Sequence, residues 1–433
     1  MNNLMSNVIF LVSEKFLTTF ILLISNIVII RYLGVDGFGQ LALFQLYFAL
    51  AVTVSEFGVR RVYSSLKSKS REALVFKEAL NIKVFFSGVF FVATGVFLFL
   101  NNYSVEYYAI LLAFVASPFE TYTYHFEANL NNQLLSTVRV SVSLILALLR
   151  ILLCALSVDI VYLILSFAIN NVIVNFTCMI LAKKRWENDV RISRNSDKAI
   201  IRKHLLSRSL FFWISIILVQ LNLRTDQFML SILAGTTSVG IYAGAYKLVE
   251  QFMTIPSMLA GVFLPHVSRT NDFDKNIYLK NLYLYSVLIS LIVSIICALI
   301  APFVLPILLG NSFIESVPVF QILMVSLPIL VLVNLSGLYY SVHKLERYAM
   351  FRNLFGLLLS LILNFLFIKQ GGVLGAAISV LISYFCVAFI VEWFLPITRR
   401  NAQLKLEVIK DIFTINVYRE LVINVKSKFF KKR

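Results

Sequence analysis

Long apolar runs separated by short polar intervals dominate the chain from near its start to about residue 395. A helix needs about 20 apolar residues to cross the hydrocarbon core of a bilayer. The runs are continuous, whereas a membrane β-strand would alternate apolar and polar residues. We therefore predict an all-α polytopic membrane protein with twelve transmembrane helices, at residues 13–33, 41–59, 80–100, 107–126, 134–156, 160–181, 210–233, 241–265, 282–305, 317–340, 354–368 and 373–395.

The longest polar interval, residues 183–209, separates six of these helices from the other six. It predicts an N-terminal six-helix bundle at 1–182, a basic cytoplasmic linker at 183–209, a C-terminal six-helix bundle at 210–396 and a basic amphipathic cytoplasmic tail at 397–433. The second half resembles the first in the placement of small residues. Gly39 and Gly240 occupy equivalent positions, each at the first predicted outer turn of its half. An even number of helices per half indicates a parallel repeat, with a central cavity between the bundles.

Composition supports the membrane interpretation, since 59% of the residues are hydrophobic and only 14% are charged. The net charge of +17 does not indicate nucleic-acid binding, because the basic residues lie in short clusters between apolar runs. Residues 60–83 hold seven Lys and Arg, residues 183–208 hold nine, and the segment after Pro396 holds ten. This bias predicts that both termini lie in the cytoplasm. The outer loops are too short to form a domain.

Motifs for catalysis, cofactors or metals do not stand out. The sequence has no HExxH, no phosphate-loop lysine motif and no G-x-S-x-G. The four cysteines lie inside apolar runs without a CxxC, so neither a disulfide framework nor a metal site is indicated. We expect that the protein is not an enzyme and binds no cofactor. Without a nucleotide site, movement of any solute against its gradient must depend on an ion gradient.

Charged residues inside the predicted seventh and eighth helices form the clearest candidate site. Because a charge at mid-bilayer is costly, it calls for a partner or a hydrated cavity. Counting from the turn near Thr237, Asp226 and Lys247 lie at similar depth, as do Arg224 and Glu250. Gln220, Arg224 and Gln227 belong to one polar stripe. Either this stripe lines an aqueous cavity in which Arg224 attracts an anion, or the four charges form a structural clamp.

The first half carries fewer internal charges. Glu120 and Arg139 lie at similar distances from the turn near Asn129 and are expected to pair. Arg150 lies a few residues from the outer surface and could extend its side chain toward it. Asp226, Glu250 and Glu120 are the candidates for carrying H⁺ or Na⁺, without further ranking.

The tail from residue 403 carries an apolar stripe with basic flanks. Its members recur mostly every three or four residues: Leu404, Val408, Ile412, Ile415, Val422, Val425 and Phe429. This pattern predicts a helix lying on the anionic inner leaflet, and the alternative is a disordered basic tail.

Several short motifs resemble those of bacterial polysaccharide exporters. They are RYLG at residues 31–34, GFGQLAL at 37–43, RTDQFML at 224–230, GIYAGAYKLVE at 240–250, FLP at 263–265 and GGVLGAA at 371–377. The chain resembles an O-antigen flippase of the Wzx type, in the multidrug/oligosaccharidyl-lipid/polysaccharide (MOP) exporter superfamily that also contains the MATE transporters.

The resemblance implies transport of an undecaprenyl-diphosphate-linked oligosaccharide from the inner to the outer leaflet, by rocking of the two halves. Basic groups such as Arg224, Lys247 and Arg150 would bind the diphosphate, with Gln220 and Gln227 in the same cavity. It also implies contacts with membrane lipid and docking with an O-antigen polymerase and a chain-length regulator. The main alternative is a cation-coupled multidrug antiporter. A membrane glycan polymerase is disfavoured because no sizeable outer loop is present.

Overall fold

The computed structural model describes residues 2–66, 72–129, 132–186, 195–267, 272–412 and 414. This part of the chain is helical and contains no β-strand. In chain order, the first elements are α1 (Asn2–Glu56), α2 (Val59–Leu66), α3 (Glu72–Leu100), η1 (Val105–Ile110), α4 (Leu111–Ala116), α5 (Glu120–Ala128), α6 (Asn132–Ala155), α7 (Ile160–Trp186) and α8 (Asn195–Leu233). The chain continues with α9 (Gly235–Val267), α10 (Asp272–Leu309), η2 (Asn311–Phe313), α11 (Ser316–Val342), α12 (Glu346–Phe385), the π-helix η3 (Cys386–Ile390), α13 (Val391–Phe394) and α14 (Arg399–Ile412).

The helices account for the twelve predicted spans. α1 contains the first two, joined at Gly34, whose φ of 64° breaks the helix. α12 contains the eleventh span and the start of the twelfth, joined at Gly372 with φ 54°, and the twelfth span continues through η3 and α13. The fourth span is divided among η1, α4 and α5, and each remaining span corresponds to one helix. Eight helices within the described residues are long and apolar enough to cross a membrane. The prediction of an all-helical polytopic membrane protein is therefore confirmed.

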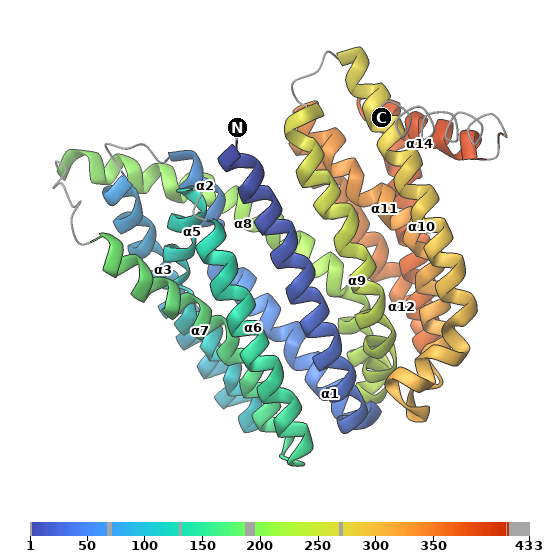
Figure 1. Ribbon diagram of the computed structural model, residues 1–433, viewed down its shortest axis with the longest axis horizontal. Helices are drawn as coiled ribbons and strands as arrows, with labels where there is room; N and C mark the ends of the chain where they lie inside the picture. Colours follow the sequence, from blue (N-terminus) through green and yellow to red (C-terminus); the bar gives the residue numbers. More distant parts are fainter. Residues whose placement is uncertain are drawn as a thin grey trace, which may run out of the picture. The chain divides into compact units, whose positions relative to one another are not determined.

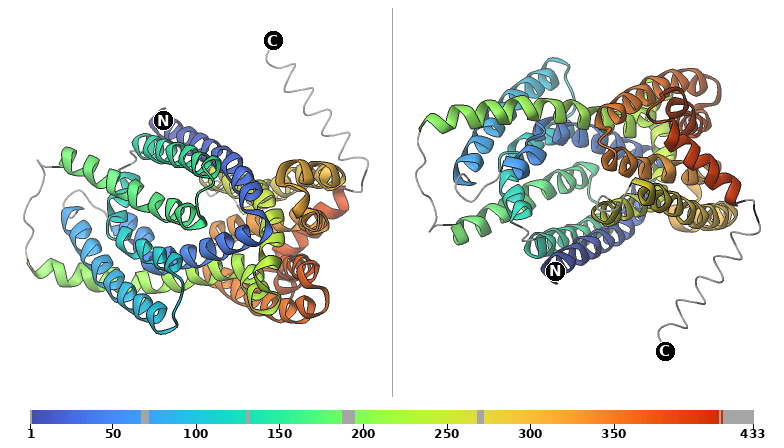
Figure 2. Two further views of the ribbon diagram at one scale, coloured as in Figure 1. Left: turned by 90° about the horizontal axis from the view of Figure 1, so that it is seen from below. Right: turned by 90° about the horizontal axis from the view of Figure 1, so that it is seen from above.

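The chain packs as two compact units. One comprises residues 1–244 with 306–313, and the other comprises residues 245–305 with 314–433. The predicted division at the linker 183–209 stays a prediction. Within the first unit, α1 packs against α6 and α8, α6 packs against α7, and α3 packs against α4 and α8 (Figures 1 and 2).

The second unit is built around α11 and α12, which pack along each other. Its main apolar cluster joins α10, α11 and α14 through Leu279, Tyr283, Leu335, Tyr339, Leu404 and Val408. α13 and η3 both contact α14. The C-terminal helix is thus part of the core of this unit.

This packing corrects the prediction for the tail. Leu404 and Val408 were expected on the inner leaflet, but they are buried at 1% and 0% exposure. The reason is that α10 and α11 offer an apolar surface that the stripe of α14 covers. The predicted helix is present as far as Ile412. The rest of the predicted stripe, Ile415, Val422, Val425 and Phe429, lies outside the described residues.

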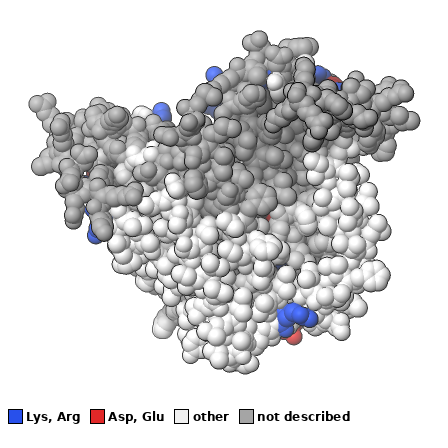
Figure 3. All heavy atoms as spheres, viewed as in Figure 1, with Lys and Arg blue, Asp and Glu red and all other residues white. Residues whose placement is uncertain are grey.

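Large apolar side chains cover much of the surface. Phe99, Leu100 and Phe303 expose 70% or more of their area. Figure 3 shows broad areas of one face without a charged residue. A soluble protein does not expose apolar area on this scale, so these surfaces face lipid. The chain is a multi-pass membrane protein.

Candidate functional site

The two turns that carry Gly39 and Gly240, which the sequence placed in register, contact each other within the first unit. A Cβ at Gly39 would lie 2.2 Å from the Thr236 carbonyl oxygen, and a Cβ at Gly240 would lie 2.0 Å from the Val35 carbonyl oxygen. Each half therefore presents a glycine to the backbone of the other half, in a reciprocal contact. Only glycine permits so close an approach. The register predicted from Gly39 and Gly240 is a structural equivalence.

A hydrogen bond supports this contact. The Thr237 hydroxyl donates to Asp36 Oδ1, and these residues are 201 positions apart, the same separation as the two glycines. The bond therefore ties the first turn of one half to the equivalent turn of the other.

The polar stripe of α8 lies next to this contact. Asp226 and Gln227 are buried at 4% and 2% exposure, while Gln220 and Arg224 are half-buried. The buried Tyr242 hydroxyl of α9 donates a hydrogen bond to Asp226 Oδ2. The Tyr242 hydroxyl is thus a described hydrogen-bond partner of Asp226, and the pairing predicted with Lys247, a residue of the second unit, stays a prediction. The stripe therefore faces protein on the Asp226 side.

Lys247 pairs within its own helix. Its Nζ lies 3.4 Å from Glu250 Oε2, one turn further along α9, and both residues belong to the second unit. An i,i+3 pair of this kind satisfies both charges locally. The pairing predicted between Arg224 and Glu250 joins residues of different units and stays a prediction.

Arg150 is the most enclosed predicted cation, at 2% exposure on α6. Its Nε and Nη2 donate to the hydroxyl and carbonyl oxygens of Ser166 at 3.1 and 3.0 Å. The guanidinium carbon lies 3.7 Å from the centroid of the Phe167 ring. Among the residues that the structure describes, no acid pairs with Arg150. The positive charge of Arg150 is therefore stabilised by the Ser166 oxygens and the Phe167 ring. No described acid neutralises this charge.

Glu120 takes a different partner from the one predicted. Lys83 Nζ of α3 lies 2.5 Å from Glu120 Oε2 and 2.9 Å from the Tyr124 hydroxyl. Arg139 pairs instead with Glu127 at 3.1 Å, and Arg60 joins the same carboxylate at 2.7 Å. The prediction of a Glu120–Arg139 pair was wrong because counting from a turn gives depth but not the face of the helix.

A second buried ionic cluster was missed by the sequence reasoning. Glu392, fully enclosed between α12 and α14, accepts hydrogen bonds from Arg352 at 3.1 Å, Lys405 at 2.7 Å and Asn401 at 2.8 Å. Burial lowers the pKa of Lys405 to about 8 against the opposing attraction of Glu392. Glu392 is an acid near the end of the last predicted span, and that signal could have identified the cluster.

These positions separate the predicted site residues into distinct groups. In the first unit, Gln220, Arg224, Asp226 and Gln227 lie on α8, Arg150 lies between α6 and α7, and Glu120 lies between α3 and α5. Lys247 and Glu250 belong to the second unit. Arg150 is the buried cation of this set that has no described acid partner.

Comparison with known proteins identifies the class. Residues 4–271 match the family model described as "Polysaccharide biosynthesis protein". This match covers more than half of the chain, so the chain belongs to this family. No curated protein sequence matches it.

Solved structures agree on the fold. The chain is similar to "Lipid II flippase MurJ, inward closed conformation", with a TM-score of 0.72 and 12% identity over 96% of this chain and 93% of that one. It is also similar to an inward-facing multidrug resistance MATE family transporter of the MOP superfamily, with a TM-score of 0.69 and 14% identity over 92% and 99%. A MOP superfamily transporter from Pyrococcus furiosus has a TM-score of 0.56 and 14% identity over 92% and 96%. The chain has the fold of the MOP superfamily.

Proposed function

We propose that the chain is a flippase that moves undecaprenyl-diphosphate-linked O-antigen oligosaccharide units across the bacterial inner membrane by alternating access. The units would enter from the cytoplasmic leaflet and leave at the periplasmic leaflet. Both termini would lie in the cytoplasm, and an ion gradient would drive the cycle. The protein would act as a transporter and not as an enzyme.

The observation that carries this proposal is the family match together with the fold. The family is one of polysaccharide biosynthesis, and a lipid II flippase shares the fold over nearly the whole chain. A lipid-linked oligosaccharide has a charged diphosphate and a hydrated glycan that cannot cross hydrocarbon unaided. A helical bundle with internal cations offers a route for such a group.

The buried charges favour this substrate over the cationic drugs of a multidrug antiporter. Arg150 keeps a positive charge that no described acid neutralises. Such a guanidinium suits a diphosphate, which it can bind through two parallel hydrogen bonds. Arg224, Lys247, Gln220 and Gln227 would complete the binding of the head group.

Among the three ion-coupling candidates, Asp226 fits best. Glu120 pairs with Lys83, and Glu250 pairs with Lys247. Asp226 is buried, and its hydrogen-bond partner is the neutral Tyr242 hydroxyl. A buried carboxylate without a described ion pair gains most from taking up H⁺ or Na⁺, even though the charge of Arg224 also acts on it. We propose Asp226 as the coupling residue.

Deletion of the gene in its host tests the function. The proposal predicts loss of surface O-polysaccharide and accumulation of lipid-linked units that a glycan-cleaving reagent outside the inner membrane cannot reach. Complementation with the intact chain restores both, which controls for effects on neighbouring genes. Normal surface glycan combined with raised sensitivity to cationic drugs would contradict the proposal and favour the antiporter. Co-purification from the complemented strain also shows whether a polymerase and a chain-length regulator dock.

A further inference from the structure

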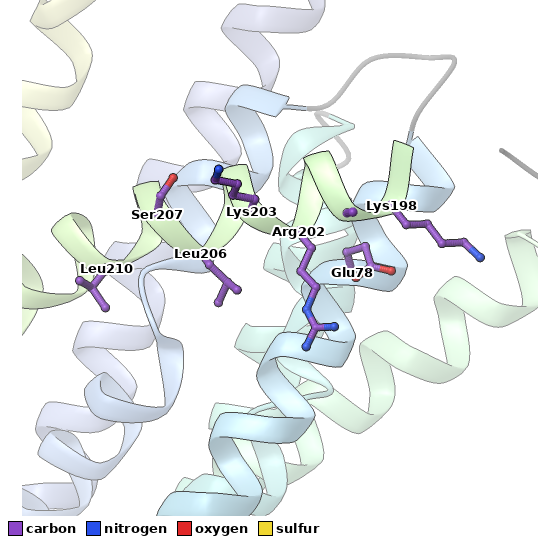
Figure 4. Close-up of a pocket in the computed structure, with 8 residues that line it drawn as sticks. Glu78, Lys198, Arg202, Lys203, Leu206, Ser207 and Leu210 are labelled. Atoms are coloured by element: carbon purple, nitrogen blue, oxygen red, sulfur yellow. The ribbon is translucent and has the colours of Figure 1, made fainter. Parts of the chain in front are cut away.

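An open groove of about 780 Å³ runs along the N-terminal part of α8 where this helix passes α3 (Figure 4). Both helices belong to the first unit. The groove is lined by Glu78, Lys198, Ala199, Arg202, Lys203, Leu206, Ser207 and Leu210. None of these residues takes part in the contacts described above.

The part of α8 that carries the basic residues of the groove is packed against α3. Ile201 and Leu205 are buried at 7% and 0% exposure in an apolar cluster that includes Val75 and Ala79 of α3. Ile201 and Leu205 pack one side of α8 against α3. The adjacent side of the same helix, which carries Arg202 and Lys203, therefore points away from the apolar cluster. The groove is therefore part of the packed fold.

Two of its cations have no partner in the described part of the chain. Arg202 and Lys203 are both exposed, and neither takes part in a hydrogen bond or an ion pair among the described residues. Glu78 is only 7% exposed, and Figure 4 shows it between the side chains of Lys198 and Arg202. Three basic residues and one acid line the groove, so it keeps an excess of positive charge.

Polarity changes along the groove. Its basic residues lie toward the start of α8, and Leu206 and Leu210 follow one and two turns later. The distance from Lys198 to Leu210 is about 18 Å at 1.5 Å per residue. Beyond Leu210 the helix continues as an apolar span. A ligand that fills the groove thus needs an anionic end and an apolar end.

We propose that this groove binds an anionic phospholipid of the leaflet that borders the start of α8. Its phosphate would lie against Arg202 and Lys203, and its acyl chains would follow Leu206 and Leu210 toward the bilayer. Anionic lipids are drawn to basic residues beside a span, and Arg binds phosphate in two parallel hydrogen bonds. A soluble phosphate would leave the apolar end of the groove unfilled.

Native mass spectrometry of the purified full chain tests the proposal, with phosphatidylglycerol and phosphatidylcholine as probes. The double variant Arg202→Gln/Lys203→Gln should retain phosphatidylglycerol about tenfold less than the unaltered chain, because two phosphate contacts are lost. Arg208→Gln is the matched control, since Arg208 is an exposed cation of the same helix outside the groove. It should retain the lipid normally.

Several outcomes would overturn the proposal. They are equal retention by the double variant, an equal loss in Arg208→Gln, and equal retention of phosphatidylcholine. Inorganic phosphate that displaces the lipid or binds alone with similar strength would show a site for a soluble anion instead. The single variants Arg202→Gln and Lys203→Gln replace exposed residues and provide the same readout if the double variant does not fold. Each should lose part of the retention.

Discussion

Arg150 combines near-complete burial with the absence of a described acid partner. A buried charge without a counter-ion costs stability, and such a residue persists where function requires the charge. Ser166 and the Phe167 ring reduce this cost without cancelling the charge. We interpret Arg150 as a cation kept for the anionic part of the substrate.

Replacing Arg150 by Gln should therefore change stability and transport in opposite directions. Arg150→Gln should keep or raise the melting temperature, because an isolated buried charge is removed, and should lower surface glycan about tenfold or more. Thermal unfolding of the purified protein and glycan staining of complemented cells measure the two effects. Lys369→Gln, at an exposed cation, is the control. Normal glycan in Arg150→Gln would remove Arg150 from the proposed site.

Glu392 represents the opposite case, a buried charge with three partners. Glu392→Gln leaves Arg352 and Lys405 enclosed without their counter-ion, so we expect a loss of about 3–5 kcal/mol in the free energy of unfolding. Glu407→Gln removes an acid that pairs with Lys280 and Arg400 at the surface and should cost about 0–1 kcal/mol. Comparable melting temperatures for the two variants would show that the cluster does not stabilise the second unit.

At the scale of elements, the α1–α9 contact depends on two glycines. Gly39→Ala and Gly240→Ala each place a Cβ about 2 Å from a backbone carbonyl oxygen, which neither helix can relieve by rotating a side chain. Each should lower the free energy of unfolding by about 1–3 kcal/mol.

Gly88→Ala is the control, since a Cβ there meets nothing within 4 Å. It should be neutral or slightly stabilising, because Ala favours the helix. Melting temperatures in one detergent compare the three variants. Unchanged stability in Gly39→Ala and Gly240→Ala would mean that the two helices are not in close contact.

α14 provides a pH-dependent prediction through Lys405. Burial lowers its pKa to about 8, from about 10.5 in the unfolded chain. Between these values the unfolded state binds more protons than the folded state, so this residue raises stability as pH increases from 8 to 10.5. The intact protein should gain stability over this range relative to Lys405→Met. Parallel stability curves would show that Lys405 keeps its ordinary pKa.

The elements were largely predictable from the sequence, because apolar runs of membrane-spanning length permit few structures. The equivalence of Gly39 and Gly240 was also visible, since a small residue at the same place in each half indicates a shared packing role. The ion pairs could not be predicted in the same way. Glu120 pairs with Lys83 and Arg139 pairs with Glu127, because a partner depends on the rotation of each helix about its axis, which depth does not determine.

At the scale of the whole molecule, the chain belongs to a family of polysaccharide biosynthesis proteins and has the fold seen in the MOP superfamily. The relatives of similar fold include a lipid II flippase and multidrug transporters. What distinguishes these two functions is the molecule that crosses the membrane.

The most direct measurement uses the purified full chain in liposomes that contain the lipid-linked oligosaccharide. An impermeant glycosidase added outside cleaves only the glycans that face it. The account predicts that, with an ion gradient imposed, the protein brings previously protected glycans within reach of the enzyme, and that Arg150→Gln does so far more slowly. The account is contradicted if the protected fraction stays constant while the same liposomes transport a cationic dye.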